Sequence, residues 1–240
     1  MTLAQRLHNC IVRDPEWHAW ADIIETHTIQ EAAKFGCDHG PKHWTSVADL
    51  ARNFVLNTTG SYNDAILADV AGLLHDCGRI CGNERHPENG AQIARAFLMA
   101  RFNKPNELAD PYQPRLSDSD IDTICHAIAN HSNGQEINTI VDVAVFFADK
   151  IDVTRDRDRV HTSSSIISEQ ATKIKRVYYE ITDSSLVLHY ETSGDFDSDV
   201  FFRWRKAYDA PAAAAKFISK NLEFYIDNKR FNLPTPNTAP

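Results

Sequence analysis

The sequence ADVAGLLHDCGRICG, residues 68–82, runs from an almost wholly apolar helical segment into the adjacent polar pair His75 and Asp76. An imidazole and a carboxylate at the mouth of an apolar segment must be hydrogen-bonded, neutralised or placed on a cation. His-Asp pairs also occur by chance at solvated helix ends, so the pair by itself does not establish a metal site. If a metal is bound here, other parts of the chain must supply further ligands.

Apolar residues at helical spacing continue on both sides of this stretch. Trp17, Trp20, Ala21 and Ile24 fall at i, i+3, i+4 and i+7, which is the pattern of one buried helical face. Ser61 or Asn63 is expected to cap the helix that leads into His75. Similar patterns predict helices at residues 3–11, 15–35, 43–55, 61–76, 86–102, 117–131 and 137–152.

The character of the sequence changes after residue 152. The charged and then serine-rich run TRDRDRVHTSSS, residues 154–165, predicts a domain boundary near Val160. KIKRVYYEI and SLVLHYE, residues 173–181 and 185–191, alternate with period two and predict a β-hairpin. Two helices are expected after it, separated at Pro211, with the second continuing through Leu222, Tyr225 and Ile226 as an amphipathic helix.

These patterns predict a mostly α-helical protein with a small C-terminal α+β appendage. The expected division is a helical domain at residues 1–160, the appendage of a β-hairpin and two helices at residues 161–231, and a disordered tail at residues 232–240. A length of 240 residues and a hydrophobic content of 42% are sufficient for one sizeable core with such an appendage.

Composition also excludes several classes of function. A net charge of -8 argues against an extended nucleic-acid-binding surface. The longest apolar stretch, residues 143–148, is far too short to cross a bilayer, and no apolar run follows a basic start, so we expect a cytoplasmic protein without a membrane partner. The five scattered cysteines are expected to be reduced thiols.

Several residues that commonly bind metals stand at helix ends or on apolar helices: His43, His75, Asp76, His86, His131 and Asp149. Imidazole nitrogen and carboxylate oxygen together suit manganese, iron, cobalt, nickel or zinc, and they suit calcium poorly. Arg79, Lys150 and Arg155 are close to these residues in sequence and could face a phosphate. P-loop, Rossmann and serine-hydrolase motifs are missing, so a metal is expected to be the reactive element.

Five motifs occur in a fixed order: CDHGPKHWTSV (37–47), LLHDCGR (73–79), HPENGA (86–91), AIANHS (127–132) and FFADKID (146–152). In this order the chain resembles the HD superfamily of metal-dependent phosphohydrolases, whose ligands are written H, HD and D. The resemblance covers roughly residues 38–155. In the first motif either His39 or His43 could be the first ligand, and we choose His43 because Val47 follows it four residues later on the helix, as in the family.

The resemblance implies that His43, His75, Asp76 and Asp149 bind one divalent metal. It further implies that Asp76 can bridge to a second ion, because His86 and His131 match the extra histidines of dinuclear members. Such a metal lowers the pKa of its bound water to near neutrality, so that hydroxide can attack phosphorus. We expect Asp76 to orient this water, Arg79 and Lys150 to act in catalysis, and Arg155 with both of them to bind a phosphorylated substrate, with a nucleotide as the expected one.

Two other functions remain open at this point. A few relatives with extra histidines use two irons and dioxygen to oxidise a substrate, so a di-iron oxygenase is the first alternative. The second is a protein that senses a nucleotide without catalysis and uses its appendage to contact a partner or a second copy of the chain. Phosphate release, oxygen consumption and metal content distinguish these functions.

Overall fold

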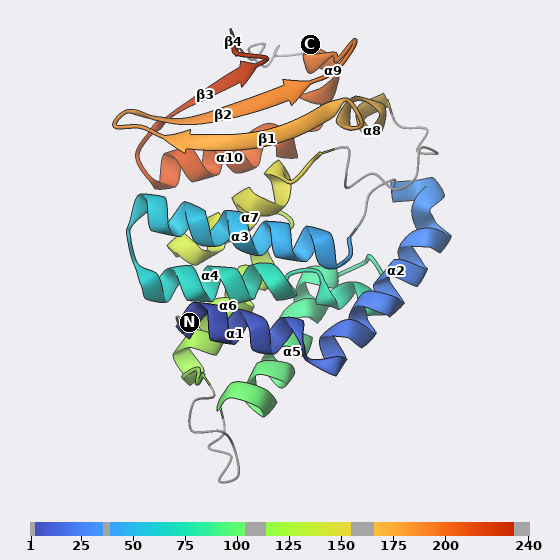
Figure 1. The fold of residues 1–240 in the computed structure, drawn as a ribbon, viewed down its shortest axis with the longest axis vertical. Coiled ribbons are helices and arrows are strands. Elements are labelled where there is room, and N and C mark those ends of the chain that lie inside the picture. Colours follow the sequence, from blue (N-terminus) through green and yellow to red (C-terminus); the bar gives the residue numbers. More distant parts are fainter. Residues whose placement is uncertain (1–2, 36–38, 104–113, 155–165, 233–240) are drawn as a thin grey trace. The chain divides into compact units, whose positions relative to one another are not determined.

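The computed structural model describes residues 3–35, 39–103, 114–154 and 166–232 (Figure 1). The chain divides into two compact units. The first comprises Met1–Gln30 with His39–Asp149, and the second comprises Glu31–Asp38 with Lys150–Pro240. The first unit is helical and the second contains a four-stranded sheet with helices. The predicted fold class, mostly α with a small C-terminal α+β part, is therefore confirmed.

The helical segments of the first unit lie where the apolar periodicity predicts them. Ser61 caps the helix that leads to His75, because its side chain accepts a hydrogen bond from the Asp64 backbone N–H. Ser117 and Asp120 form a reciprocal capping box at the start of another helix. The elements are α1 (Leu3–Val12), α2 (Pro15–Phe35), α3 (Pro41–Thr58), α4 (Tyr62–Leu74), a 3-10 turn η1 (Cys77–Cys81), α5 (His86–Leu98), a π turn η2 (Met99–Asn103), α6 (Asp118–Asn130) and α7 (Ile140–Ile151).

Helices α3 and α4 lie side by side and form a large part of the core (Figure 1). A Cβ atom on Gly72 would lie 2.6 Å from the Ala48 Cα, so only glycine allows the two backbones to approach this closely. Trp44 on α3 is buried and packs edge to face against Trp17 on α2, with ring centroids 5.1 Å apart. This close, rigid packing holds the start of α3 beside the end of α4, so His43 comes next to His75.

A second close backbone contact lies between η1 and α5. A Cβ atom on Gly78 would lie 2.0 Å from the His86 carbonyl oxygen and 2.4 Å from the Gly90 nitrogen. The backbone that follows Asp76 is therefore pressed against the first turns of α5. Helix α5 also packs along α6, which ends at His131. These contacts bring the start of α5 and the end of α6 to the same place as the end of α4.

The second unit contains a sheet with strand order β1-β2-β3-β4. Strands β1 (Ile174–Ile181) and β2 (Ser185–Thr192) form the predicted antiparallel hairpin, and β2 pairs in parallel with β3 (Asn221–Ile226). Strand β4 (Lys229–Phe231) pairs antiparallel with β3. The remaining elements are α8 (Ile166–Ala171), α9 (Ser198–Phe201) and α10 (Lys206–Phe217), and the parallel connection from β2 to β3 runs through α9 and α10.

The prediction of two helices separated at Pro211 is wrong. Pro211 lies inside α10, and the break falls earlier, between the end of α9 and Lys206. The proposed continuation of the last helix through Leu222 and Ile226 is also wrong. Ser219 has a positive φ of 56° and ends the helix, and the residues after it form β3.

Three further expectations concern the cysteine thiols, membrane-spanning helices and the domain boundary. Cys10, Cys77, Cys81 and Cys125 are free thiols, whereas Cys37 lies outside the described residues. Within the parts of the chain that the structure describes, no helix is both long and apolar enough to cross a membrane. The predicted boundary at Val160 and the tail from residue 233 onward also lie outside the described residues.

Candidate metal centre

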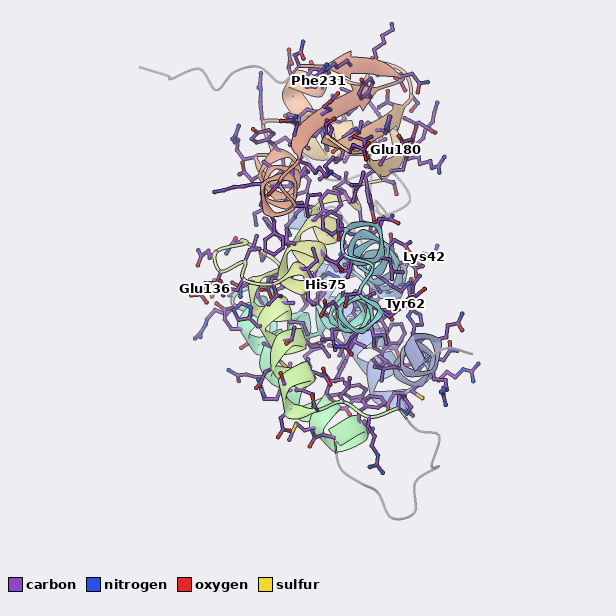
Figure 2. The ribbon with its side chains drawn as sticks, turned by 90° about the vertical axis from the view of Figure 1, so that its left-hand side faces the viewer. Lys42, Tyr62, His75, Glu136, Glu180 and Phe231 are labelled. Carbon is purple, nitrogen blue, oxygen red and sulfur yellow. The ribbon has the colours of Figure 1, made fainter. Side chains whose placement is uncertain are left out.

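Five helix ends in the first unit carry the predicted ligands. His43 lies in the first turn of α3, His75 and Asp76 follow α4, His86 begins α5, His131 follows α6 and Asp149 is near the end of α7. All six side chains are buried: His86 is 9% exposed, and each of the others is at most 5% exposed. Figure 2 shows His75 inside the helical unit, with Lys42, Tyr62 and Glu136 at its surface. The structure thus brings all six residues together.

The first group of donor atoms contains His43, His75, Asp149 and one oxygen of Asp76. His43 Nε2 lies 3.1 Å from His75 Nε2 and 3.2 Å from Asp149 Oδ1. Asp76 Oδ2 lies 3.5 Å from His75 Nε2 and 3.9 Å from His43 Nε2. Ligands at about 2.1 Å from a tetrahedral cation lie roughly 3.4 Å from one another. The spacing of this group therefore fits one metal ion.

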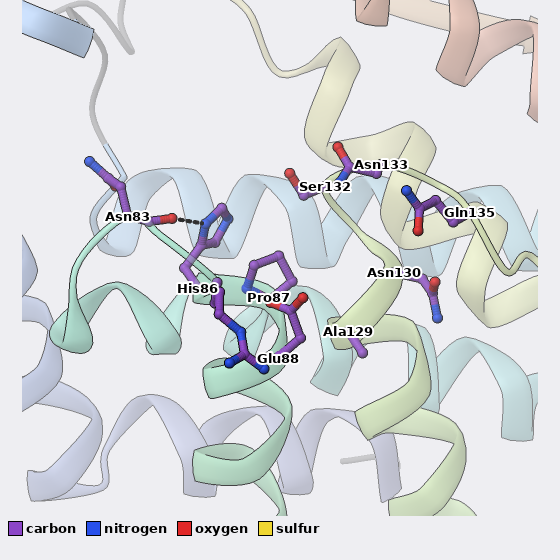
Figure 3. A pocket seen from close by; sticks show the side chains of 10 residues that line it. Asn83, His86, Pro87, Glu88, Ala129, Asn130, Ser132, Asn133 and Gln135 are labelled. Atoms are coloured by element: carbon purple, nitrogen blue, oxygen red, sulfur yellow. Dashed lines mark hydrogen bonds between the residues drawn. The ribbon is translucent and has the colours of Figure 1, made fainter.

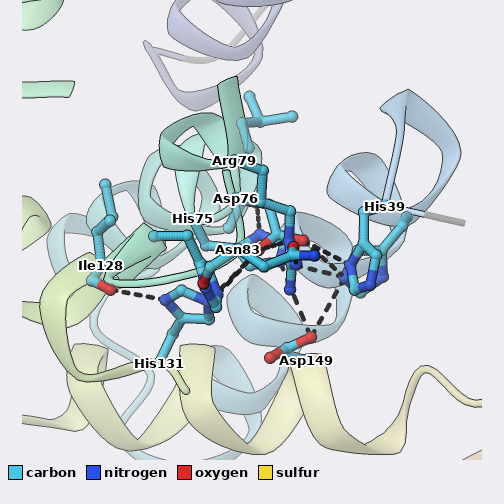
Figure 4. Close-up of polar contacts among 12 residues, drawn as sticks. His39, His75, Asp76, Arg79, Asn83, Ile128, His131 and Asp149 are labelled. Carbon is cyan, nitrogen blue, oxygen red and sulfur yellow. Dashed lines mark hydrogen bonds and ion pairs between the residues drawn. The ribbon is translucent and has the colours of Figure 1, made fainter. Parts of the chain in front are cut away.

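The second group contains His86, His131 and the other oxygen of Asp76. The two Nε2 atoms lie 3.2 Å apart. Asp76 Oδ1 lies 3.6 Å from His86 Nε2 and 3.5 Å from His131 Nε2. These distances again fit ligands around one cation. Asp76 is thus placed between two groups of histidines, with one carboxylate oxygen facing each group (Figure 4).

The proton positions on the histidine rings support a cation in the second group. His86 Nδ1 donates to the Asn83 carbonyl oxygen at 2.9 Å, and His131 Nδ1 donates to the Ile128 carbonyl oxygen at 2.6 Å. Because a carbonyl only accepts, Nδ1 carries the proton in both rings, and Nε2 of each neutral ring is then an acceptor. Two acceptors 3.2 Å apart cannot hydrogen-bond to each other, whereas a cation between them satisfies both.

Burial and charge set the ionisation of these groups. Burial lowers the pKa of His86 to about 4, with Arg79 adding to this effect. Burial also lowers the pKa of His75, although Asp76 opposes the shift. For Asp76, burial by itself raises the pKa, but Arg79, His75 and His39 more than offset it and hold the pKa well below its ordinary value. Neutral imidazoles beside an ionised carboxylate are the forms that bind a metal.

Arg79 and His39 contact Asp76 directly, and Asn83 contacts Arg79 and His86. Arg79 Nε lies 2.7 Å from Asp76 Oδ1, and Arg79 Nη1 donates to Asn83 Oδ1 at 2.5 Å. His39 Nδ1 lies 2.8 Å from Asp76 Oδ2, so the structure places both candidate first histidines, His39 and His43, at this carboxylate. Asn83 was not foreseen, because a loop asparagine has no distinctive sequence spacing. Its carbonyl and its side chain hold His86 and Arg79 respectively.

Lys150 and Arg155 are the last two of the predicted site residues. Lys150 follows Asp149 on α7 and is buried, with 8% of its surface exposed. Arg155 lies outside the described residues. The roles of both in catalysis or substrate binding stay predictions. His126 does not join the centre: its Nδ1 pairs with Asp142 Oδ1 at 2.8 Å, and Asp142 also accepts from the backbone N–H groups of Asn138 and Thr139.

Comparison with protein families agrees with this arrangement. The family model described as HD domain matches residues 42–154. The match contains the six grouped residues and begins after His39. No curated protein matches the chain with significant similarity. Residues 42–154 therefore match the HD domain family, as the sequence resemblance predicts.

Proposed function

We propose that this protein is a metal-dependent phosphohydrolase that cleaves a phosphate ester or phosphoanhydride of a small molecule. The observation that carries the proposal is the position of Asp76, whose two oxygens face separate groups of buried histidines. HD domains in general bind divalent metals and belong to a metal-dependent hydrolase superfamily. The donor set of imidazoles and carboxylates suits manganese, iron, cobalt, nickel or zinc, as one ion or two.

When bound, the metal supplies a Lewis acid and an activated water as nucleophile. The residues of the chain hold the centre in the form that this chemistry needs. Backbone carbonyls fix the rings of His75, His86 and His131, so that Nε2 of each points into the centre. Arg79 keeps Asp76 ionised and fixes one of its oxygens. In this role Arg79 is a positioning residue for Asp76, and its predicted contact with substrate phosphate stays a proposal.

Phosphate release in the presence of manganese, cobalt or nickel tests the proposal. A panel should contain phosphate monoesters, diesters and nucleoside triphosphates, since the bond that is cleaved and the predicted nucleotide specificity both need direct measurement. The variants His75→Ala and Asp149→Ala should lose metal and activity together, because each removes a ligand of the first group. His18→Ala is a matched control, since His18 is an exposed histidine on α2. Turnover at the wild-type rate by either ligand variant after metal removal would contradict the proposal.

A di-iron oxygenase is the second candidate. The pairing of His86 with His131 favours it, because this pair completes a second group of ligands beside Asp76. Two irons per chain together with oxygen consumption and no phosphate release would select the oxygenase. Phosphate release without oxygen consumption selects the phosphohydrolase.

A further inference from the structure

A polar cavity of about 270 Å³ lies beside the second group of ligands (Figure 3). Its walls come from two segments, residues 83–88 before and within the first turn of α5, and residues 129–135 at and after the end of α6. The volume is just below the usual range of ligand pockets, which span roughly 300–1,000 Å³. The cavity is therefore suited to a small molecule.

The walls of the cavity and the ligands of the metal centre are parts of the same two segments. Arg85 and Pro87 flank His86, which itself lines the cavity, and Asn130 and Ser132 flank His131. His86 Nε2 lies 3.6 Å from Asp76 Oδ1. A molecule in the cavity thus lies next to the His86 side of the centre, where one end of it can reach the metal.

The cavity wall is rich in neutral hydrogen-bonding groups. Asn130 is fixed, because its amide donates to the His126 carbonyl oxygen at 3.0 Å and accepts from the Glu136 backbone N–H at 3.2 Å. Ser132 and Gln135 form no side-chain hydrogen bond with other residues that the structure describes. A hydroxyl and a primary amide both donate and accept, so these two groups are available to a ligand.

The charged and aromatic side chains of the cavity wall restrict the class of ligand further. Apart from His86, the charged side chains on the wall are one cation, Arg85, and one anion, Glu88, so their charges balance. No Phe, Tyr or Trp is among the lining residues, so a nucleobase finds no aromatic side chain of these types to stack on. A carboxylate, a hydroxyl and an amide instead match the hydroxyl groups of a sugar or polyol, which donate and accept in turn.

We propose that this cavity binds the hydroxyl-rich organic part of the substrate, and that the substrate is a small sugar or polyol monophosphate. The proposal rests on the proposed phosphohydrolase function, and it replaces the nucleotide expected from the sequence. Ser132, Gln135 and Glu88 hold the hydroxyl groups, while the phosphate lies at the metal centre.

The first test measures phosphate release by the manganese-loaded protein. Its substrates are ribose 5-phosphate, ribitol 5-phosphate and glycerol 1-phosphate, compared with AMP, CMP and p-nitrophenyl phosphate. The sugar and polyol phosphates should have kcat/KM values at least tenfold above those of the other compounds. A nucleotide that is preferred by tenfold would overturn the proposed pocket ligand while leaving the phosphohydrolase function in place.

The second test uses variants of the cavity wall. Gln135→Leu and Ser132→Ala should each raise KM for the best polyol phosphate by roughly five- to tenfold, the loss of about one hydrogen bond. Gln92→Leu is the matched control, because Gln92 is an exposed residue of α5 outside the cavity wall. An equal KM for Gln135→Leu, Ser132→Ala and Gln92→Leu would overturn the proposal.

A binding measurement tests which ligand the cavity binds, independently of phosphate release. Titration calorimetry of the manganese-loaded protein with ribitol, ribose and adenosine requires no turnover. Ribitol or ribose should bind more tightly than adenosine, and Gln135→Leu should weaken this binding. If no phosphate is released from any compound but ribitol binds in this manner, the phosphohydrolase function fails and the pocket assignment stands. Tighter binding of adenosine overturns the pocket assignment.

Discussion

His86 and His131 face each other through Nε2 atoms that lie 3.2 Å apart, while each ring donates its Nδ1 proton to a backbone carbonyl. When both rings are neutral, these nitrogens are acceptors directed at the same small space. The same two nitrogens lie near Asp76 Oδ1, so three potential ligands converge there. A second metal ion is the arrangement that this geometry supports best.

Replacing one of these histidines should remove the second metal ion and leave the first in place. We expect His131→Ala to reduce the metal content from two ions to one per chain, because the first group keeps His43, His75, Asp149 and Asp76. Activity should fall by at least about tenfold. Elemental analysis after equilibration with manganese measures the content, with His18→Ala as the control. A content that is unchanged in His131→Ala would remove the basis for a second ion.

Arg79 should matter through its contact with Asp76. Arg79→Met removes the ion pair at 2.7 Å and the hydrogen bond to Asn83, so the Asp76 carboxylate loses its main fixed charge partner. We expect metal affinity or kcat to fall by about 10- to 100-fold. Arg95→Met is the control, because Arg95 forms an exposed pair with Asp122, and such pairs contribute about 0–1 kcal/mol. Metal titrations that are the same for both variants would contradict this role.

The close contact at Gly78 predicts an effect that reaches the metal centre. A Cβ atom there would strike the His86 carbonyl and the Gly90 nitrogen, which belong to the backbone and cannot turn away. Gly78→Ala should therefore lower the free energy of unfolding by about 3 kcal/mol, the upper end for overpacking, and also reduce metal content.

Gly60→Ala provides the comparison for Gly78→Ala. Gly60 has a positive φ of 68° and open space around it, so the substitution should cost about 1–2 kcal/mol of left-handed strain. It should leave metal content unchanged, since Gly60 touches no part of the centre. Urea unfolding and elemental analysis together distinguish the two variants. Full metal content in Gly78→Ala would show that the η1–α5 contact does not position His86.

A pH effect on stability is expected from His8 and Asp69. His8 Nδ1 lies 2.8 Å from Asp69 Oδ2, and this hydrogen bond raises the pKa of His8 in the folded protein. The stabilisation is fully present below the pKa of the unfolded chain, about 6.5, and is lost as the pH rises through the higher folded value. The contribution should be roughly 1 kcal/mol, because the His8 side chain is 22% exposed.

His8→Gln should therefore make the free energy of unfolding fall less between about pH 6 and pH 8 than it does in the wild-type protein. His18→Gln is the control variant, since His18 is an exposed histidine outside the His8–Asp69 pair. Urea unfolding across this pH range measures both variants. Identical pH profiles for wild type and His8→Gln would show that the pair does not contribute.

The grouping of the candidate metal-binding residues could be anticipated because they stand at helix ends. A polar residue at the end of an apolar helix is visible in the sequence, and tight packing such as that of Gly72 against Ala48 brings those ends together. His39 was harder to assign, since the spacing in its motif allows either histidine. The polar cavity could not be foreseen at all, because its two walls are about 45 residues apart in sequence and meet only in the fold.

The wrong helix predictions for the second unit have local physical causes. Leu222, Tyr225 and Ile226 fit a helical stripe as well as a strand, so the apolar pattern alone was ambiguous. Helix α10 ends because Ser219 adopts a left-handed conformation. Serine seldom adopts this conformation, so the sequence gives no indication of it. Asp227 and Asn228, both with positive φ, form the turn between β3 and β4, and such a dipeptide is a hairpin signal that the helix prediction did not take into account.

The most direct test of the proposed centre is a crystal structure of the manganese-loaded protein with an anomalous difference map. We expect two peaks roughly 3.5–4 Å apart on opposite sides of the Asp76 carboxylate. One peak should lie among His43, His75, Asp149 and Asp76 Oδ2, and the other among His86, His131 and Asp76 Oδ1. A fully loaded crystal without a peak at His86 and His131, or with no peak at Asp76, would contradict the proposed two-metal centre.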